Sequence, residues 1–311
     1  MSIPPDHAAS PRAAARDGVA AGTVAVCAQI APRLGDLPTN LGTHAEILRD
    51  AAGAGADLVL FPELSLTGYF LRDLVPDVAI RIDGPELAGL AAVAPATAAI
   101  VGCVIETDDH RFLNAAVLLH GGRAVLAHAK VHLPTYGLFD ERRYLAPGDR
   151  LRPLAVPGPD GSAWRAGVLV CEDIWHPAAV VVLARAGMEL LLVQSASPGR
   201  GIREGRGGLG TARSYAAITQ AHAQLTTAYL LFCNRVGYEE GIGFWGGSRL
   251  VGPDGELCGT PAEDTEALCW FRLDPAAVRR ARVATPLLRD ERTAVIDAEL
   301  ARLRRLEEDR P

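Results

Sequence analysis

The sequence predicts an α/β fold in a single domain, built from a mixed sheet system with helices on the outside. Apolar strand-like segments alternate with helix-like segments along most of the 311 residues. Some strand-like segments are apolar throughout, which is typical of parallel strands buried on both faces, whereas others pair as hairpins. No linker rich in proline, glycine or serine divides the chain, and this favours one domain over two.

In the first half of the chain, the strand-like segments are short runs rich in apolar and β-branched residues. The glycine pair Gly121–Gly122 lies between two of them and predicts a hairpin. The predicted strands are 23–30, 57–63, 98–106, 114–120 and 123–130, and the predicted helices are 39–54 and 84–94.

The second half continues the alternation and ends in a charged helical tail from about residue 289. Residues 247–259 predict a second hairpin. The remaining predicted strands are 165–173, 188–197, 228–237 and 266–273, and the remaining predicted helices are 177–186 and 211–225.

The composition is that of an enzyme-sized globular protein, with 49% hydrophobic and 22% charged residues. A formal net charge of −6 provides no basic surface for nucleic acid or an anionic membrane. No apolar run is long enough to span a bilayer, and residues 1–22 read as a disordered leader without a signal peptide. We therefore expect a cytoplasmic protein with no nucleic-acid or membrane partner.

Six cysteines lie far apart, with no CxxC pair and no spacing typical of metal ligands. Five of them lie in or beside apolar runs, which predicts inert core thiols in a reducing compartment. Cys171 differs, because it ends the run "GVLV" and is followed at once by Glu172 and Asp173. Acidic neighbours raise a thiol pKa, so this segment taken alone favours a small buried residue before a solvated turn.

Three predicted strands end in a group that can carry chemistry: Glu63, Lys130 and Cys171. Each has an ordinary alternative as an exposed acid, a surface lysine or a core thiol. Ligands in α/β sheets bind at the carboxyl ends of the strands, where these three side chains would meet. There the carboxylate can take the thiol proton, the thiolate can attack a carbon–nitrogen group, and the lysine can stabilise the resulting oxyanion. The lysine would also offset the acids beside Cys171.

One segment, "SPGRGIREGRGGLG" (197–210), is rich in glycine and predicts a mobile loop. Its arginines, Arg200, Arg203 and Arg206, are either solvated or positioned to bind an anionic group of a small ligand.

Several segments carry a family resemblance. These segments are "LFPELSLTGYFLRDL" (60–74), "KVHLPTYGLFDERRYLAPGD" (130–149), "LVCEDIWHP" (169–177), "CNRVGYEEGIGFWGGSRLVGPDGEL" (233–257) and "ATPLLRDERTAVIDAEL" (284–300). Through them the sequence resembles the nitrilase superfamily of carbon–nitrogen hydrolases, and within it the glutamine amidotransferase domain of glutamine-dependent NAD synthetases.

The resemblance implies a four-layer αββα sandwich and a homo-oligomer. It implies Glu63 as general base, Lys130 as oxyanion stabiliser and Cys171 as nucleophile. Glu141 matches a second glutamate that orients substrate, and the peptide N–H of Glu172 matches a second oxyanion donor. No metal or organic cofactor is implied.

Substrate contacts are implied at Tyr69, Trp175, Ser197 and Arg203, for which core packing of the aromatics and loop hydrogen bonding of Ser197 are alternatives. The implied organisation is a leader at 1–22, a carbon–nitrogen hydrolase domain at 23–285 and a helical tail at 286–311 that contacts other subunits.

Two departures from the family pattern affect the expected activity. The usual "NASP" reads "SASP" at 195–198, so one amide group near the pocket is missing. No glycine-rich loop for ATP pyrophosphate follows the resembling region, so we do not expect this chain to make NAD by itself.

We therefore expect an amidase that releases ammonia from glutamine or another small, carboxylate-bearing amide through a cysteine thioester. A nitrilase acting on a small nitrile and a carbamoyl hydrolase are alternatives that use the same residues. A third alternative, of a different class, is a non-catalytic or ammonia-supplying subunit that docks on a separate synthetase.

Overall fold

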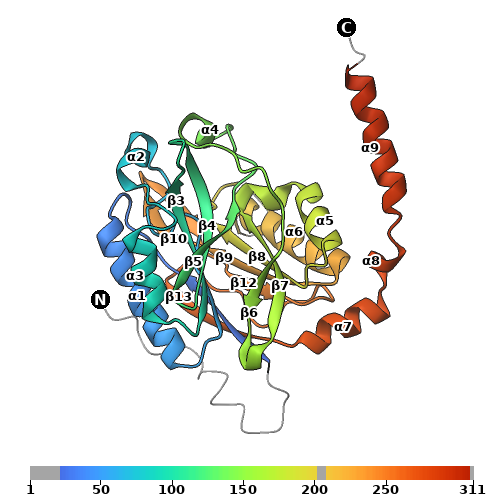
Figure 1. Cartoon of the computed structure of the whole chain (residues 1–311), viewed down its shortest axis with the longest axis horizontal. Helices are drawn as coiled ribbons and strands as arrows, with labels where there is room; N and C mark the ends of the chain where they lie inside the picture. Colours follow the sequence, from blue (N-terminus) through green and yellow to red (C-terminus); the bar gives the residue numbers. More distant parts are fainter. Residues whose placement is uncertain (1–21, 202–207, 309–311) are drawn as a thin grey trace.

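The computed structural model describes residues 22–201 and 208–308 of the chain. Two β-sheets pack against each other, and helices cover the outer face of each sheet (Figure 1). This is the αββα sandwich implied by the resemblance, and that prediction of fold class is confirmed.

The first sheet has six strands in the order β13-β1-β2-β3-β4-β5. The pairs β1–β2 and β2–β3 are parallel, and the other neighbours are antiparallel. Its strands are β1 (Thr23–Gln29), β2 (Leu58–Leu60), β3 (Ala98–Glu106), β4 (Phe112–His120), β5 (Arg123–Ala129) and β13 (Ala267–Leu273).

The second sheet has five strands in the order β12-β9-β8-β7-β6, with β7, β8 and β9 parallel. Its strands are β6 (Leu154–Pro157), β7 (Ala163–Val170), β8 (Leu190–Ser195), β9 (Tyr229–Asn234) and β12 (Arg249–Val251). A separate hairpin is formed by β10 (Val236–Glu239) and β11 (Ile242–Trp245).

The outer layers are helical. Helices α1 (Leu37–Gly53) and α3 (Pro85–Val93) cover the first sheet, and α5 (Pro177–Arg185) and α6 (Gly210–Thr226) cover the second. Asp36 caps α1 by accepting the Thr39 N–H at 3.2 Å. The remaining elements are α2 (Val75–Val78), α4 (Glu141–Tyr144), α7 (Pro275–Ala284), α8 (Leu287–Asp290), α9 (Thr293–Glu308) and the 3₁₀ turns η1 (Arg72–Leu74), η2 (Pro159–Gly161) and η3 (Cys171–Trp175).

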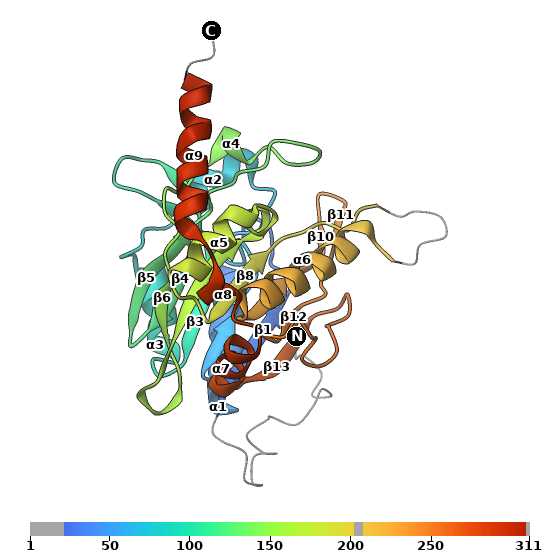
Figure 2. The ribbon, with the colours of Figure 1, turned by 90° about the vertical axis from the view of Figure 1, so that its right-hand side faces the viewer.

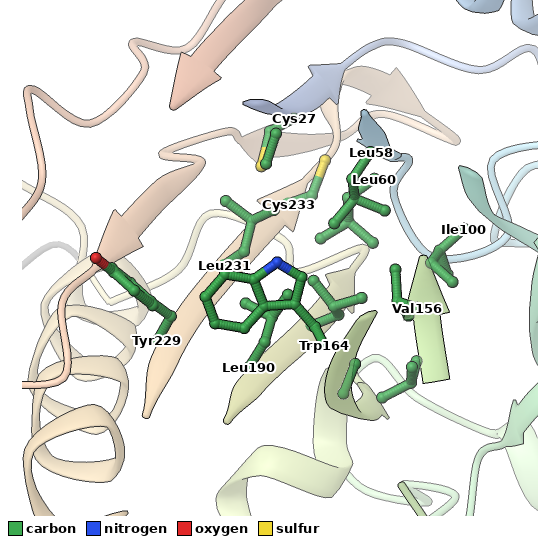
Figure 3. Close-up of a cluster of buried hydrophobic side chains, with 14 of the residues drawn as sticks. Cys27, Leu58, Leu60, Ile100, Val156, Trp164, Leu190, Tyr229, Leu231 and Cys233 are labelled. Atoms are coloured by element: carbon green, nitrogen blue, oxygen red, sulfur yellow. The ribbon is translucent and has the colours of Figure 1, made fainter. Parts of the chain in front are cut away.

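The alternation of side chains along each strand builds this layered core. In β1, Ala25 and Cys27 pack between the two sheets, whereas Val26 and Ala28 pack under the helices. Because both faces of the central strands are buried, these strands are apolar throughout. Figure 3 shows the layer between the sheets, where Cys27, Leu60 and Ile100 of the first sheet lie near Cys233, Leu231 and Leu190 of the second.

The C-terminal tail forms helices, and α9 extends away from the sandwich (Figures 1 and 2). No residue of α9 is buried. Its apolar side chains are Val295, Ile296, Leu300, Leu303 and Leu306, and all are at least 40% exposed. The amphipathic face of this helix therefore has no partner within the described part of the chain.

Three details differ from the sequence prediction. The strand predicted at 57–63 covers only Leu58–Leu60, because Pro62 lacks the N–H that would continue the ladder. The hairpin predicted at 247–259 forms only in part: an antiparallel bridge joins Val251 to Leu257, and its first strand, β12, pairs with β9. Helix α7 was not predicted, although Asp274 caps it by accepting the Ala276 N–H at 2.9 Å.

Gly102 in β3 packs directly under the segment that carries Glu63. A Cβ atom at this position would lie 2.5 Å from both Leu64 N and Pro62 O. We expect Gly102→Ala to lower the free energy of unfolding by about 1–3 kcal/mol, measured by urea denaturation. Gly89→Ala is the matched control, because a Cβ there meets nothing within 4 Å. In the α3 helix it should instead add about 0.5–1 kcal/mol. Equal effects of the two substitutions would contradict the prediction.

Candidate active site

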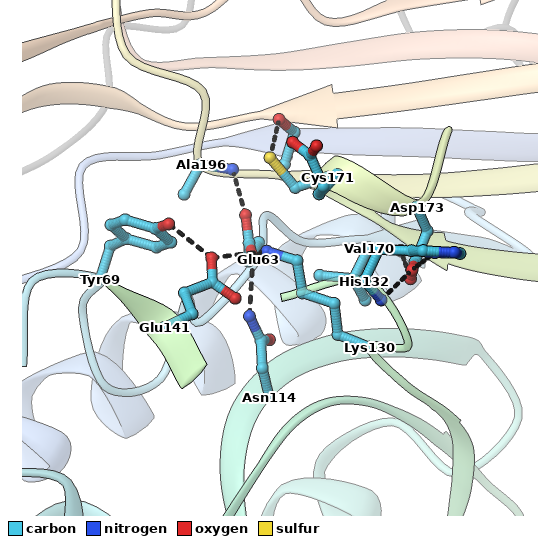
Figure 4. Close-up of polar contacts among 12 residues, drawn as sticks. Glu63, Tyr69, Asn114, Lys130, His132, Glu141, Val170, Cys171, Asp173 and Ala196 are labelled. Atoms are coloured by element: carbon cyan, nitrogen blue, oxygen red, sulfur yellow. Dashed lines mark hydrogen bonds and ion pairs between the residues drawn. The ribbon is translucent and has the colours of Figure 1, made fainter. Parts of the chain in front are cut away.

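The structure brings the three predicted strand-end groups together (Figure 4). Glu63 lies three residues after β2, Lys130 directly follows β5, and Cys171 directly follows β7. All three side chains are buried. Glu63 and Lys130 therefore come from the first sheet, and Cys171 comes from the second.

The carboxylate of Glu63 is held by three donors. Its Oε1 accepts from Lys130 Nζ at 2.7 Å and from Asn114 Nδ2 at 2.7 Å. Its Oε2 accepts the peptide N–H of Ala196 at 2.8 Å. These contacts fix both oxygens of a side chain that is only 1% exposed, so the carboxylate is oriented before any ligand arrives.

Glu141, at the start of α4, shares the same lysine. Its Oε1 accepts from Lys130 Nζ at 2.6 Å and from Tyr69 Oη at 2.5 Å. Its Oε2 is buried and has no hydrogen-bond partner among the residues that the structure describes. Burial raises the pKa of Glu141 to about 7, with a further contribution from the charge of Glu63 and an opposing one from Lys130.

Lys130 lies between the two carboxylates. Burial alone would lower the pKa of Lys130, but the charges of Glu141 and Glu63 outweigh it and hold that pKa well above the usual value. Lys130 is therefore an ammonium group at neutral pH, and two of its three N–H bonds point at Glu63 and Glu141.

Cys171 stands on a backbone turn in the left-handed region, with φ of 46°. Its Sγ lies 3.5 Å from Ser195 Oγ, which donates to it, and 3.4 Å from Tyr215 Oη. Burial and the charge of Glu63 raise the pKa of the Cys171 thiol to about 12, although Lys130 acts in the opposite direction. The sulfur is thus a neutral thiol at rest, with a base nearby.

The two acids after Cys171 are occupied by other donors. The Glu172 carboxylate accepts from Tyr136 Oη at 2.9 and 3.0 Å. The Asp173 carboxylate is buried and accepts from His128 and His132. The main negative charge acting on the thiol is therefore that of Glu63, and not that of its sequence neighbours.

The residues predicted to contact substrate differ in their burial and in their neighbours. Tyr69 is buried against Glu141, and Trp175 is 39% exposed with its ring 5.4 Å from that of Tyr215. Ser197 is buried, and its N–H donates to Asn234 Oδ1 at 2.8 Å. Arg203 lies outside the described residues.

Arg200 of the same glycine-rich segment is described. Its guanidinium carbon lies 5.0 Å from the centre of the Phe139 ring. The Phe139 ring in turn makes an edge contact with Tyr69, with centroids 6.3 Å apart. At least one arginine of this segment therefore lies near the Tyr69–Glu141 pair.

A cavity of about 170 Å³ adjoins this side of the cluster. Tyr69 and Glu141 line it together with mostly apolar side chains, among them Leu64, Val75 and Leu145. Glu63, Lys130 and Cys171 do not line it.

Sequence reasoning missed four residues of the site: Asn114, Asp173, Ser195 and Tyr215. Asn114 carried a usable signal, because it is an amide within an otherwise apolar strand and such groups need a partner. Ser195 was noted only as the loss of an asparagine, whereas its hydroxyl donates to Cys171 Sγ. Tyr215 is one of many apolar positions along α6, and its sequence context carries no signal.

Two further searches of the described residues bear on function. Within 22–201 and 208–308, no cluster of three or more His, Cys, Asp or Glu side chains is arranged to hold a metal ion. Of the helices in these ranges, none has both the length and the apolar character needed to cross a membrane.

Comparison with known proteins places this arrangement in a family. Residues 23–283 match the family described as carbon-nitrogen hydrolase. The chain belongs to the carbon–nitrogen hydrolase family. It is a hydrolase acting on carbon–nitrogen bonds, and the predicted resemblance to carbon–nitrogen hydrolases and to glutamine-dependent NAD synthetases is confirmed.

Three relatives illustrate the similarity. The glutamine-dependent NAD(+) synthetase of Rhodobacter capsulatus is 37% identical over 236 residues, covering 74% of this chain and 40% of that protein. A Pseudomonas protegens protein named "Hydrolase in pqqF 5'region" is 30% identical over 302 residues, covering 96% of this chain and 98% of that protein. The structure of the NitN amidase of Nesterenkonia sp. AN1 has a TM-score of 0.73 at 24% identity, covering 89% of this chain and 99% of that one, which shows the fold alone.

The chain thus spans less than half the length of the NAD synthetases that it matches, 40% for that of R. capsulatus and 38% for that of Thermotoga maritima. In contrast, it spans nearly the whole of the P. protegens hydrolase.

The raised pKa of Cys171 can be tested without a substrate. A thiol with a pKa of about 12 stays protonated at neutral pH, and it loses its proton only as the pH rises through that value. We expect the thiolate absorbance at 240 nm, taken as wild type minus Cys171→Ser, to show no step between pH 6 and 9. A step below pH 8 would show that the free site already holds a thiolate.

Proposed function

We propose that this carbon–nitrogen hydrolase releases ammonia from a small primary amide through a Cys171 thioester. The observation that carries the proposal is the buried cluster in which Lys130 Nζ lies 2.7 Å from Glu63 and 2.6 Å from Glu141, beside the Cys171 thiol (Figure 4). A base, a cation and a nucleophile in one desolvated site are the parts that covalent acyl transfer requires.

In the acylation step, the Glu63 carboxylate takes the thiol proton as sulfur attacks the amide carbon. The oxyanion that forms is stabilised by the third N–H bond of Lys130 and by the peptide N–H of Glu172. That N–H lies in the first turn of η3, where it has no acceptor within the helix. The tetrahedral intermediate then expels ammonia, which receives its extra proton from Glu63.

In the second step, water hydrolyses the thioester. Glu63, again a carboxylate, takes a proton from the attacking water, and the second tetrahedral intermediate expels the sulfur of Cys171. The proton on Glu63 returns to that sulfur, so the free thiol and the carboxylate are both restored. Glu63 therefore serves as base and acid in turn, which its three fixed hydrogen bonds support.

Glu141 is proposed to orient the amide. Its Oε2, which has no partner within residues 22–201 and 208–308, can accept an N–H of the substrate, while its Oε1 remains bound to Lys130 and Tyr69. An unsatisfied buried carboxylate oxygen is costly, so a substrate N–H that fills this position gains both energy and orientation.

We propose a glutamine-like substrate, or another amide with a carboxylate a few bonds away. The support is the position of Arg200 beside Phe139, and the presence of Arg203 and Arg206 in the same segment. A guanidinium group pairs a carboxylate strongly and with fixed orientation. We propose Tyr69, Trp175, Ser197 and Arg203 as further contacts, with a small nitrile or an N-carbamoyl compound as alternative substrates.

The matched NAD synthetases favour one further alternative, in which the chain supplies ammonia to a separate synthetase. The P. protegens hydrolase, matched along nearly its whole length, favours a protein that acts alone. We propose the latter, in the cytoplasm and without a metal or organic cofactor.

Self-association through α9 is a separate proposal. A helix with five apolar side chains at least 40% exposed is unusual for an isolated subunit, because such surfaces are normally buried. A second copy of the chain can cover this face by packing α9 against its own counterpart or body.

Assay of ammonia release from a panel of glutamine, simple amides, nitriles and N-carbamoyl compounds tests the proposed activity. We expect Cys171→Ser to lower turnover by roughly three orders of magnitude or more, because members of a catalytic unit act together. Cys103→Ser is the control, since Cys103 lies in the core away from the cluster and should affect stability instead. Near-normal turnover in Cys171→Ser would overturn the mechanism.

The two glutamates should fail at different steps. Glu63→Gln cannot take the thiol proton, so no thioester should form, whereas Glu141→Gln should acylate slowly and with raised KM. Mass spectrometry of each variant after mixing with substrate measures the acyl-enzyme directly. Full thioester occupancy in Glu63→Gln would contradict the assigned role.

Charge substitution tests the role of the tail helix. We expect Ile296→Glu combined with Leu300→Glu to convert the protein to a monomer, as measured by light scattering. Burying the two new carboxylates in an apolar interface would cost too much free energy. Val125→Glu, at another exposed apolar position outside the tail, is the control and should leave the mass unchanged. A monomeric wild-type protein would refute the proposal.

A further inference from the structure

Asp173 has more hydrogen-bond donors around its carboxylate than Glu63 or Glu141, although the proposed chemistry gives it no part. It is fully buried. Its Oδ1 accepts from Val131 N at 3.2 Å, His132 N at 2.9 Å and His132 Nδ1 at 2.8 Å. Its Oδ2 accepts from His128 Nε2 at 2.8 Å and Val170 N at 3.2 Å.

These donors flank the two groups that must meet. His128, Val131 and His132 lie on either side of Lys130, and Val170 directly precedes Cys171. The first three follow or end β5 in the first sheet, and Val170 ends β7 in the second sheet. One carboxylate therefore ties the two sheets together at the point where each delivers a side chain to the site (Figure 4).

The carboxylate is ionised. Burial alone would raise the pKa of Asp173, but the hydrogen bonds from His128 and His132 hold it well below its usual range. A carboxylate can only accept, so His128 Nε2 and His132 Nδ1 must both carry protons. The His132 ring also stacks on the His176 ring, with centroids 3.7 Å apart.

We infer that Asp173 is a positioning residue that sets the distance between the Lys130 ammonium and the Cys171 thiol. It acts through the backbone on both sides rather than by touching substrate. The inference rests on the proposed function, since the spacing of Lys130 and Cys171 matters only if the two act in one reaction.

The substitution Asp173→Asn is a sharp test because it keeps the shape of the side chain. Each carboxylate oxygen receives at least one backbone N–H: Oδ1 from Val131 and His132, and Oδ2 from Val170. Backbone donors cannot change tautomer, so the NH₂ group that replaces one oxygen must face one of them in either orientation of the new amide. The backbone hydrogen bonds to one side, either Val131 and His132 or Val170, are therefore lost, whichever way the amide turns.

The test measures turnover together with alkylation of Cys171 by iodoacetamide at pH 7, followed by mass spectrometry. We expect Asp173→Asn to lower kcat at least a hundredfold with KM changed less than threefold, and to slow Cys171 alkylation at least tenfold. Asp57→Asn is the matched control, because Asp57 accepts the Val24 N–H at 2.8 Å far from the site. It should lower the melting temperature and leave both rates per folded molecule within about twofold of wild type.

If Asp173→Asn fails to fold, the inference can be tested by removing a single hydrogen-bond donor to Asp173. His128→Ala deletes one donor to Oδ2 and should lower kcat about tenfold, whereas His128→Gln, whose amide can donate in its place, should recover most of it. Recovery of this kind is not expected from a general loss of stability.

The outcomes separate the two proposals. If wild type releases no ammonia from any compound in the panel, the proposed function fails, and the alkylation rates still test Asp173. If wild type is active but Asp173→Asn keeps kcat and the alkylation rate within threefold of wild type, the positioning role is refuted and the proposed function stands. The same result for His128→Ala decides the question if Asp173→Asn does not fold.

Discussion

The site depends on a buried ionic network in which one ammonium group is shared by two carboxylates. Lys130 lies 2.7 Å from Glu63 and 2.6 Å from Glu141, and all three side chains are buried away from bulk solvent. Unpaired charge in such a place is costly, so Lys130 and the two carboxyl groups stabilise and orient one another. Burial, with a further contribution from the charge of Glu63, raises the pKa of Glu141 and keeps the Cys171 thiol neutral.

The hydrogen bonds of Glu172 and Asp173 explain why these two acids add little negative charge at the cysteine sulfur. Glu172 and Asp173 each accept from donors of other segments, and η3 holds them away from the sulfur. The main negative charge acting on the thiol is that of Glu63, the carboxylate that we propose receives its proton. A neutral thiol beside an ionised base avoids burying a second anion until a substrate provides an electrophile and a place for the charge.

The sequence allowed the layers and the reactive groups to be predicted, because both follow from local pattern and motif. Apolar runs located the central strands, and the motif segments located Glu63, Lys130 and Cys171. The contacts of Asp173 and Tyr215 could not be predicted in this way, since they join segments that are 41 to 45 residues apart. Helix α7 and the short extent of β2 were missed because an N-cap and a proline decide them, rather than apolar periodicity.

The origin of the reacting groups links catalysis to the packing of the sandwich. Glu63, Asn114 and Lys130 belong to the first sheet or its strand ends, whereas Cys171, Ser195 and Ala196 belong to the second. The Glu63 carboxylate and the Cys171 thiol therefore meet only when the apolar layer between the sheets is formed. Small residues in that layer, such as Ala25 and Ala166, let the sheets approach closely, and the Ala196 N–H then reaches Glu63 at 2.8 Å. The same packing that stabilises the fold thus sets the geometry of the site, and neither sheet carries the chemistry alone.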